Sequence, residues 1–154
     1  MSHMTRVKTK LSSKECLLKA LSDMGFSANK VQISDTPQHI TGYQGDTREQ
    51  TAEIIIPRYH VGGAANDIGF KLQEDGTWGA LISDYDRGNR SADSKSVHAK
   101  GCNGYSEKWL KKLYQRYSYH KVKESLTSQG FFISEETEEN GEIFMNVDTS
   151  GFGG

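Results

Sequence analysis

The chain has 154 residues, enough for one domain of ordinary size that buries a core without metal ions or cross-links. A formal net charge of -1 excludes a polyanion binder that acts through overall charge, so any basic surface must be local. Two cysteines make no disulfide framework, and no apolar run approaches the roughly 20 residues of a membrane span or forms a secretory signal. These values predict a soluble, cytoplasmic protein.

The first helix is expected between residues 12 and 25, after a first strand at residues 5–11. Ser12 and Glu15 have the spacing of a capping box, which marks a helix start. Apolar residues then recur at intervals of three and four, the stripe of a helix that lies on a sheet. Gly25 has the place of a C′ glycine, which ends a helix.

Short strands should follow this helix. Pro57 marks the end of one of them or a sheet edge. Asp75 and Gly76 are a typical hairpin turn pair, flanked by strands at 68–73 and 77–85. The earlier strands are expected at 30–33, 39–43 and 53–58, with a turn at 35–37 and a polar loop at 42–48.

Two connections within the chain lack the character of helix or strand. Residues 61–66 (VGGAAN) are rich in glycine, but the lysine and Ser/Thr of a phosphate-binding loop are missing and a strand follows, which favours a bend. Residues 86–105 carry almost no apolar side chain and predict a long polar loop; loops of this length are usually functional or mobile.

The longest helix is expected at residues 106–129, with Gly130 as its stop. A hairpin should follow it, because Asn140–Gly141 is a strong turn signal. The strands of this hairpin are expected at 131–135 and 142–147, and a flexible tail at 149–154.

Both helices end in the same pattern, Leu-x-x-x-Gly-Phe, at residues 21–26 and 126–131. Each helix also lies between strand signals, which indicates two related strand-helix-strand halves, about 1–62 and 64–148. The prediction is a single α+β domain, residues 1–148, in which an antiparallel sheet carries two helices on one face.

The long helix has two apolar stripes when its residues are placed at 100° intervals. The first consists of Leu110, Leu113, Tyr114 and Tyr117, and the second of Tyr119, Val122 and Leu126. Lys112, Arg116, His120 and Lys123 occupy much of the remaining arc. One interpretation is a core helix with solvated cations, whose second stripe docks a protein. The other is a surface on which aromatic rings stack with single-stranded nucleic acid while the cations neutralise its phosphates.

No catalytic constellation and no metal-ligand spacing appear in the sequence. His98 and Cys102 lie four residues apart in the polar loop, which is only a weak zinc signal. Asp84, Asp86 and Asp93 lack the spacing of a calcium-binding loop, so a solvated loop is the simpler interpretation. We therefore expect no cofactor and no metal, although a metal enzyme using His98, Cys102 and these aspartates is a third hypothesis.

Three segments of the chain carry a resemblance to a known family. They are Met1-Ser2-His3 with Val7-Lys8-Thr9-Lys10, Asp67-Ile68-Gly69-Phe70, and residues 115–122 (QRYSYHKV). From residue 1 to about 148 the chain resembles the hypothetical chloroplast reading frame thirty-five family, a domain of unknown function of cyanobacteria, red-algal plastids, bacteria and some viruses. The chain departs from that pattern in the insert 86–105 and in its glycine-ended tail.

The resemblance implies no activity or catalytic residue. Some bacterial members accompany AAA-type ATPases, which suggests an accessory role, and a plastid-encoded member would lie in the stroma. The sequence thus predicts a non-enzymatic protein-interaction or adaptor module, whose partner is another protein such as an AAA-type ATPase, or a second copy. The alternative is binding of single-stranded nucleic acid or a nucleotide through helix 106–129. The expected contacts in either case are Lys112, Arg116, Tyr119, His120 and Lys123.

Overall fold

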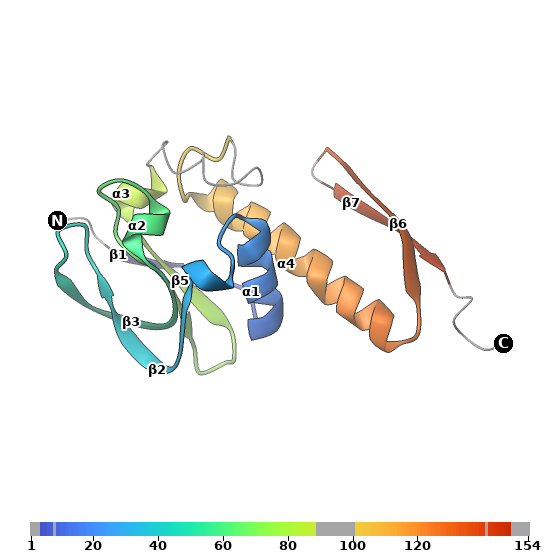
Figure 1. Ribbon diagram of the computed structural model, residues 1–154, viewed down its shortest axis with the longest axis horizontal. Coiled ribbons are helices and arrows are strands. Elements are labelled where there is room, and N and C mark those ends of the chain that lie inside the picture. Colours follow the sequence, from blue (N-terminus) through green and yellow to red (C-terminus); the bar gives the residue numbers. More distant parts are fainter. Residues whose placement is uncertain (1–3, 8, 89–100, 141, 149–154) are drawn as a thin grey trace.

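The computed structural model describes residues 4–7, 9–88, 101–140 and 142–148, and these form an α+β fold (Figure 1). Five strands make an antiparallel sheet in the order β1-β5-β4-β3-β2, and β6 and β7 pair only with each other. The strands are β1 (Met4–Val7), β2 (Gln32–Thr41), β3 (Thr47–Ile56), β4 (Ile68–Leu72), β5 (Trp78–Ser83), β6 (Phe132–Glu139) and β7 (Glu142–Asp148). The helices are α1 (Lys14–Asp23), α2 (Arg58–Val61), α3 (Asp84–Arg87) and α4 (Glu107–Ser128), with a 3₁₀ turn at Ala28–Lys30.

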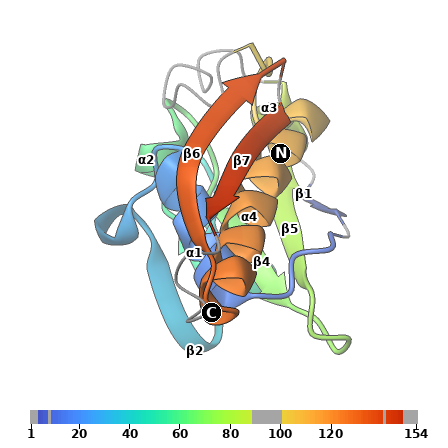
Figure 2. The ribbon, with the colours of Figure 1, turned by 90° about the vertical axis from the view of Figure 1, so that its right-hand side faces the viewer.

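Helices α1 and α4 pack together on one face of the five-stranded sheet, as expected (Figures 1 and 2). Trp109 and Leu113 of α4 lie in one cluster with Leu17 of α1 and with Ile54 and Phe70 of the sheet. The other face of the sheet carries a smaller cluster that includes Ile40 and Leu81. The larger cluster is therefore the main core, and most of the hydrophobic driving force comes from the face that the helices cover.

Helix α1 begins one residue later than the capping box predicted. Ser13 is the N-cap, and its side chain accepts from the Cys16 amide at 3.2 Å. Glu15 therefore cannot act as the reciprocal acceptor, and the capping box at Ser12 is wrong. The reason is tertiary: the backbone amides of Ser12 and Ser13 both donate to the Tyr117 hydroxyl of α4, at 2.9 and 2.8 Å.

The two long helices end in the same hydrogen-bonded cap. Gly25 and Gly130 adopt φ angles of 97° and 85°, and the amide of the following phenylalanine donates to a leucine carbonyl one turn back, Leu21 or Leu126. This is the Schellman motif, in which a residue of positive φ satisfies the last carbonyls of the helix. The shared Leu-x-x-x-Gly-Phe pattern encodes this cap, and the hypothesis of two related halves stays a prediction.

One of the turns that the sequence predicted near the sheet is wrong, and the other turns are confirmed. The expected turn at residues 35–37 is wrong, because β2 runs through it with a register shift between Ile33 and Gln38. β2 is an edge strand, where a bulge that contains a proline costs no sheet hydrogen bond to a further strand. The two hairpins, the strand end before Pro57 and the bend at 61–66 are confirmed.

A buried polar network closes the base of the predicted loop 86–105. Asp86 is fully buried, and its Oδ2 accepts from Ser83 Oγ at 2.7 Å and from the Asn66 amide at 3.0 Å. Its carbonyl accepts from the Tyr105 amide, and the Tyr105 hydroxyl donates to the Val61 carbonyl. The expectation of a solvated Asp86 is therefore wrong; residues 89–100 and 149–154 lie outside the described residues.

Burial raises the pKa of Asp86 above its ordinary value near 3.8, although the hydrogen bonds from Ser83 and Asn66 oppose this shift. Desolvation disfavours the charged carboxylate, whereas donors that point at it favour the charge. The folded protein consequently holds this proton more tightly than the unfolded chain does.

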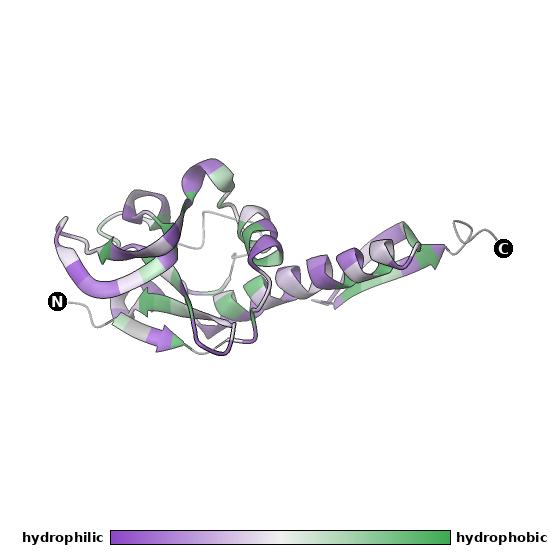
Figure 3. Ribbon diagram, turned by 90° about the horizontal axis from the view of Figure 1, so that it is seen from below, coloured by the Kyte–Doolittle hydropathy of each residue, from purple (hydrophilic) through white to green (hydrophobic). Residues whose placement is uncertain are grey.

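Helix α4 extends beyond the sheet that it covers. Figure 3 shows hydrophobic residues gathered between α1, α4 and the sheet, while the C-terminal half of α4 and the β6–β7 hairpin project from this body. In the part of the chain that the structure describes, no helix is long and apolar enough to cross a membrane. Among the described residues, the projecting half of α4 contacts the hairpin on one side and Asp23 and Cys16 of α1 on another.

Substituting Asp86 by alanine is expected to lower the free energy of unfolding by about 2–4 kcal/mol, because buried donors of Asn66 and Ser83 lose their acceptor. Urea denaturation measures this change in the free energy of unfolding. Asp35→Ala on the exposed part of β2 is the control and is expected to change stability by less than about 0.5 kcal/mol.

The loss of stability in Asp86→Ala should also depend on pH. Because the pKa of Asp86 is raised in the folded protein, the contribution of Asp86 to stability is greatest below the ordinary pKa and declines as the pH rises through the folded pKa. The cost should therefore be larger at about pH 4 than at about pH 7; the reverse order would contradict the direction of the shift.

Candidate functional site on helix α4

The first apolar stripe of α4 lies in the core, with one exception. Leu113 and Tyr117 are buried and Leu110 is partly buried, but Tyr114 is 42% exposed. Trp109, which the stripe did not include, is fully buried. The helix contacts both the sheet and α1, and its buried arc is therefore shifted toward Trp109 and away from Tyr114.

The second apolar stripe of α4 faces the β6–β7 hairpin. Figure 2 shows the hairpin lying in front of the helix, and a groove of about 540 Å³ separates the two. Tyr119, Val122 and Leu126 line the helix side of this groove. Ile143, Met145 and Val147, which alternate along β7, line the other side. The chain therefore supplies part of the cover for the second stripe, and the groove remains open.

Tyr119 joins α4 to the hairpin through its hydroxyl, which donates to the carboxylate of Glu136 with both oxygens at 2.7 Å. Lys123 completes the contact, with its Nζ 3.3 Å from the Tyr119 hydroxyl and 3.9 Å from Glu136. Burial raises the pKa of Tyr119 above its ordinary value near 10, and the hydrogen bond to Glu136 raises it further. The phenol thus stays protonated and remains a donor to Glu136 at neutral pH.

Arg116 and His120 join α4 to α1 through one carboxylate. Asp23 Oδ2 lies 2.9 Å from Arg116 Nε and 2.7 Å from His120 Nε2. The guanidinium of Arg116 also lies 4.5 Å from the centre of the Tyr119 ring, within cation–π range. Arg116 therefore lies between the contact of α4 with α1, through Asp23, and the contact of α4 with the hairpin, through Tyr119.

The structure brings together four of the five residues that the sequence singled out: Arg116, Tyr119, His120 and Lys123. Lys112 does not join them and instead lines a cavity of about 450 Å³ with Cys102 and Tyr114. The sequence missed the β7 side of the groove, although the alternation of Ile143, Met145 and Val147 was a signal for a one-sided apolar strand.

The metal hypothesis falls partly on residues that the structure does not describe, since His98 and Asp93 lie outside the described residues. Cys102 is buried, and Asp86 is engaged by Asn66 and Ser83. Within the described ranges, no group of three or more His, Cys, Asp or Glu residues could hold a metal ion.

Comparison with known proteins places the chain in a family without an assigned activity. Residues 20–145 match the family model described as "Protein of unknown function (DUF1257)", so the chain belongs to this family. The chain is 29% identical over 148 residues to "Uncharacterized protein ycf35" of Cyanophora paradoxa, which covers 96% of each protein. The resemblance to the reading frame thirty-five family is thereby confirmed. No solved structure gives a significant match.

Several residues in the segments that carry the family resemblance make hydrogen bonds or close contacts that hold neighbouring elements together. Asp67 accepts from the amides of Thr41 and Arg58, both at 2.7 Å, and so ties two connections to the start of β4. Gly69 lies where a Cβ would be 2.8 Å from that of Ala52, a separation that side chains do not tolerate. In α4, Tyr117 and Tyr119 hold α1 and the hairpin.

Substituting Tyr119 by phenylalanine is expected to loosen the hairpin, because the hydrogen bond to the Glu136 carboxylate is lost at a cost of about 1.5–3 kcal/mol. Hydrogen exchange followed by mass spectrometry should show faster exchange in residues 132–148 by about tenfold or more, with little change in the main sheet. Tyr114→Phe is the matched control, since the Tyr114 ring is exposed. Unchanged exchange in the hairpin would contradict this role for Tyr119.

Proposed function

We propose that this protein is a non-enzymatic protein-interaction module that binds its partner in the groove between α4 and the β6–β7 hairpin. The observation that carries the proposal is the groove itself, which is apolar on both sides and open. A volume of about 540 Å³ falls in the range of ligand-binding clefts, roughly 300–1,000 Å³. Tyr119, which lines the groove, would serve as an anchor, with Lys123 one turn further along α4. Arg116 and His120 lie on the side of the helix that faces α1, and Lys112 lines a different cavity.

Exposed apolar side chains on the hairpin support this proposal. Phe132, Phe144 and Val147 are 59%, 50% and 41% exposed. An isolated two-stranded hairpin is only marginally stable in water, and β6 and β7 are both free at their outer edges among the described strands. A partner that covers these side chains would remove apolar area from water and stabilise the hairpin at the same time.

The charge of the hairpin indicates the chemistry of the partner. Residues 132–148 contain no lysine or arginine. Their acidic residues are Glu135, Glu136, Glu138, Glu139, Glu142 and Asp148. The partner segment that fits best therefore presents apolar side chains flanked by lysine or arginine, because complementary potentials guide association and select the partner.

Photo-crosslinking from inside the groove tests this proposal. A benzoylphenylalanine introduced at Val122 should crosslink to a discrete protein in cells of the natural source, and the crosslinked peptide should be apolar and basic. Val122→Glu should weaken capture of the same partner by at least about tenfold, since it places a carboxylate in a groove lined mostly by apolar side chains.

Lys121 provides the matched control, because it is exposed on α4 next to Val122 and does not line the groove. A crosslinker at Lys121 should give none of the products obtained from Val122. Identical products from both positions, or undiminished capture by Val122→Glu, would show that the partner does not occupy the groove.

Binding of single-stranded nucleic acid receives less support from the geometry. Asp23 lies against Arg116 and also contacts His120, and Glu136 lies against Lys123, so the cations Arg116 and Lys123 already have carboxylates beside them. Nucleic-acid binding gains affinity when lysine or arginine side chains neutralise phosphates and release their counterions, and a cation already paired with a carboxylate contributes less to this gain.

A fluorescent oligothymidine is therefore expected to bind with a Kd weaker than about 0.1 mM at physiological salt, which is weaker than the usual range of non-specific affinity. Fluorescence anisotropy measures this. Tight binding that weakens steeply with salt and is lost in Lys112→Glu would overturn this expectation and favour the nucleic-acid hypothesis.

A further inference from the structure

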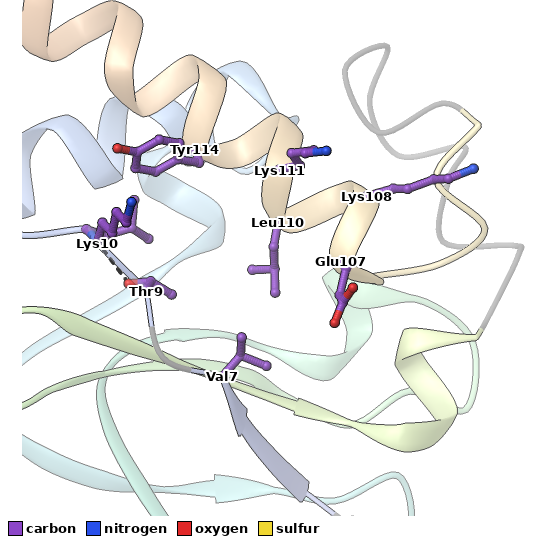
Figure 4. A pocket seen from close by; sticks show the side chains of 9 residues that line it. Val7, Thr9, Lys10, Glu107, Lys108, Leu110, Lys111 and Tyr114 are labelled. Atoms are coloured by element: carbon purple, nitrogen blue, oxygen red, sulfur yellow. Dashed lines mark hydrogen bonds between the residues drawn. The ribbon is translucent and has the colours of Figure 1, made fainter.

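A second cavity lies at the other end of α4, between its first turns and the segment that links β1 to α1. Its volume is about 510 Å³. Figure 4 shows Val7 and Leu110 pointing toward one another across it, with Lys10 and Tyr114 at one end. The complete lining is Val7, Thr9, Lys10, Leu11, Glu107, Lys108, Leu110, Lys111 and Tyr114.

Residues 9–11, which form one wall, are held in place. The hydroxyl of Thr9 donates to the Trp78 carbonyl of β5 and accepts from the Leu11 amide at 3.1 Å. The Trp78 amide donates to the Leu11 carbonyl at 2.7 Å. These contacts fix the backbone of this wall against the sheet, so the cavity is formed before any ligand arrives.

The rim of this cavity is positively charged. Lys10, Lys108 and Lys111 make no ion pair with any carboxylate among the described residues, whereas the single acidic lining residue, Glu107, lies 4.0 Å from the guanidinium of Arg87. Excess positive charge beside an apolar cavity attracts anions and disfavours cations.

The start of α4 adds to this positive potential. Ser106, the N-cap, makes no capping hydrogen bond, and its hydroxyl donates instead to the Cys102 carbonyl at 2.6 Å. The first amides of a 22-residue helix therefore lack the usual side-chain acceptor, and the positive end of the helix dipole lies at the rim of the cavity.

We propose that this cavity, which we call the lysine pocket, binds a small amphipathic anion, a molecule with an apolar planar or aliphatic body and a carboxylate, phosphate or sulfonate group. The apolar body lies between Val7, Leu110 and the exposed ring of Tyr114. The anionic group lies at the rim, close to the start of α4. Lys108 and Lys111 line the cavity, and their ammonium groups, which point away from Val7 and Leu110 in Figure 4, would turn toward the bound anion. This site is separate from the groove and does not depend on the proposed interaction with a protein.

A matched pair of dyes tests both parts of the proposal. Anilinonaphthalene sulfonate carries the anionic group, and N-phenyl-1-naphthylamine has the same ring system without it. Fluorescence titration should show one site for the sulfonate and weaker binding of the neutral dye, because only the sulfonate gains from the lysines. The double variant Lys108→Glu/Lys111→Glu should weaken sulfonate binding by about tenfold and leave the neutral dye unaffected.

Two controls separate the pocket from general effects of charge and from the groove. Lys19→Glu/Lys121→Glu makes the same change in net charge at exposed positions outside the pocket and should bind the sulfonate as the wild type does. Val122→Glu, which alters the groove, should also leave sulfonate binding unchanged. Tyr114→Ala should weaken both dyes, since it removes a wall of the cavity.

Several outcomes would overturn the proposal. Undiminished sulfonate binding in Lys108→Glu/Lys111→Glu would show that these lysines hold no anion. An equal loss in Lys19→Glu/Lys121→Glu would reduce the effect to net charge. A loss in Val122→Glu alone would move the dye site to the groove, without deciding whether a protein partner binds there.

Discussion

The length of helix α4 is the constraint on which the rest of the structure depends. Its 22 residues span about 33 Å at 1.5 Å per residue. The central strands β4 and β5 have 5 and 6 residues and span about 17–20 Å. Trp109, Leu113 and Tyr117 of the first half of α4 complete the core over the sheet, and the second half needs another cover. The β6–β7 hairpin provides it only in part, which leaves the apolar groove.

Three tyrosine hydroxyls join the elements that meet at α4. Tyr105 donates to the end of α2, Tyr117 accepts from the start of α1, and Tyr119 donates to the hairpin. In each case the ring contributes buried area while the hydroxyl makes a hydrogen bond to another element. Tyr117 and Tyr119 of the family segment thus have structural contacts, and the proposed groove lies directly beside them.

The two cavities that flank these joints differ in chemistry. The groove is walled on one side by an acidic hairpin and suits a basic, apolar protein segment. The lysine pocket is rimmed by cations at the positive end of the helix and suits a small anion. The two cavities share no lining residue, so substitutions can alter one without changing the lining of the other, and each can be tested alone.

The sequence by itself determined the features whose causes are local. Glycine caps, the Asp75–Gly76 and Asn140–Gly141 turns and the strand periodicity each depend on a few neighbouring residues, so the α+β class, both long helices and the hairpins could be predicted. The stripe of Tyr119, Val122 and Leu126 was also visible, because helical periodicity is local.

Only the tertiary structure decided what those features contact. Ser13 rather than Ser12 caps α1 because the hydroxyl of Tyr117, 104 residues away, takes both amides. Asp86 is buried because Asn66 and Ser83 surround it, and Arg116 and Lys123 lie against carboxylates of other elements. Whether a charged or polar side chain is exposed to solvent or contacts another residue depends on residues that folding brings together. The spacing of residues in the sequence does not indicate those long-range contacts.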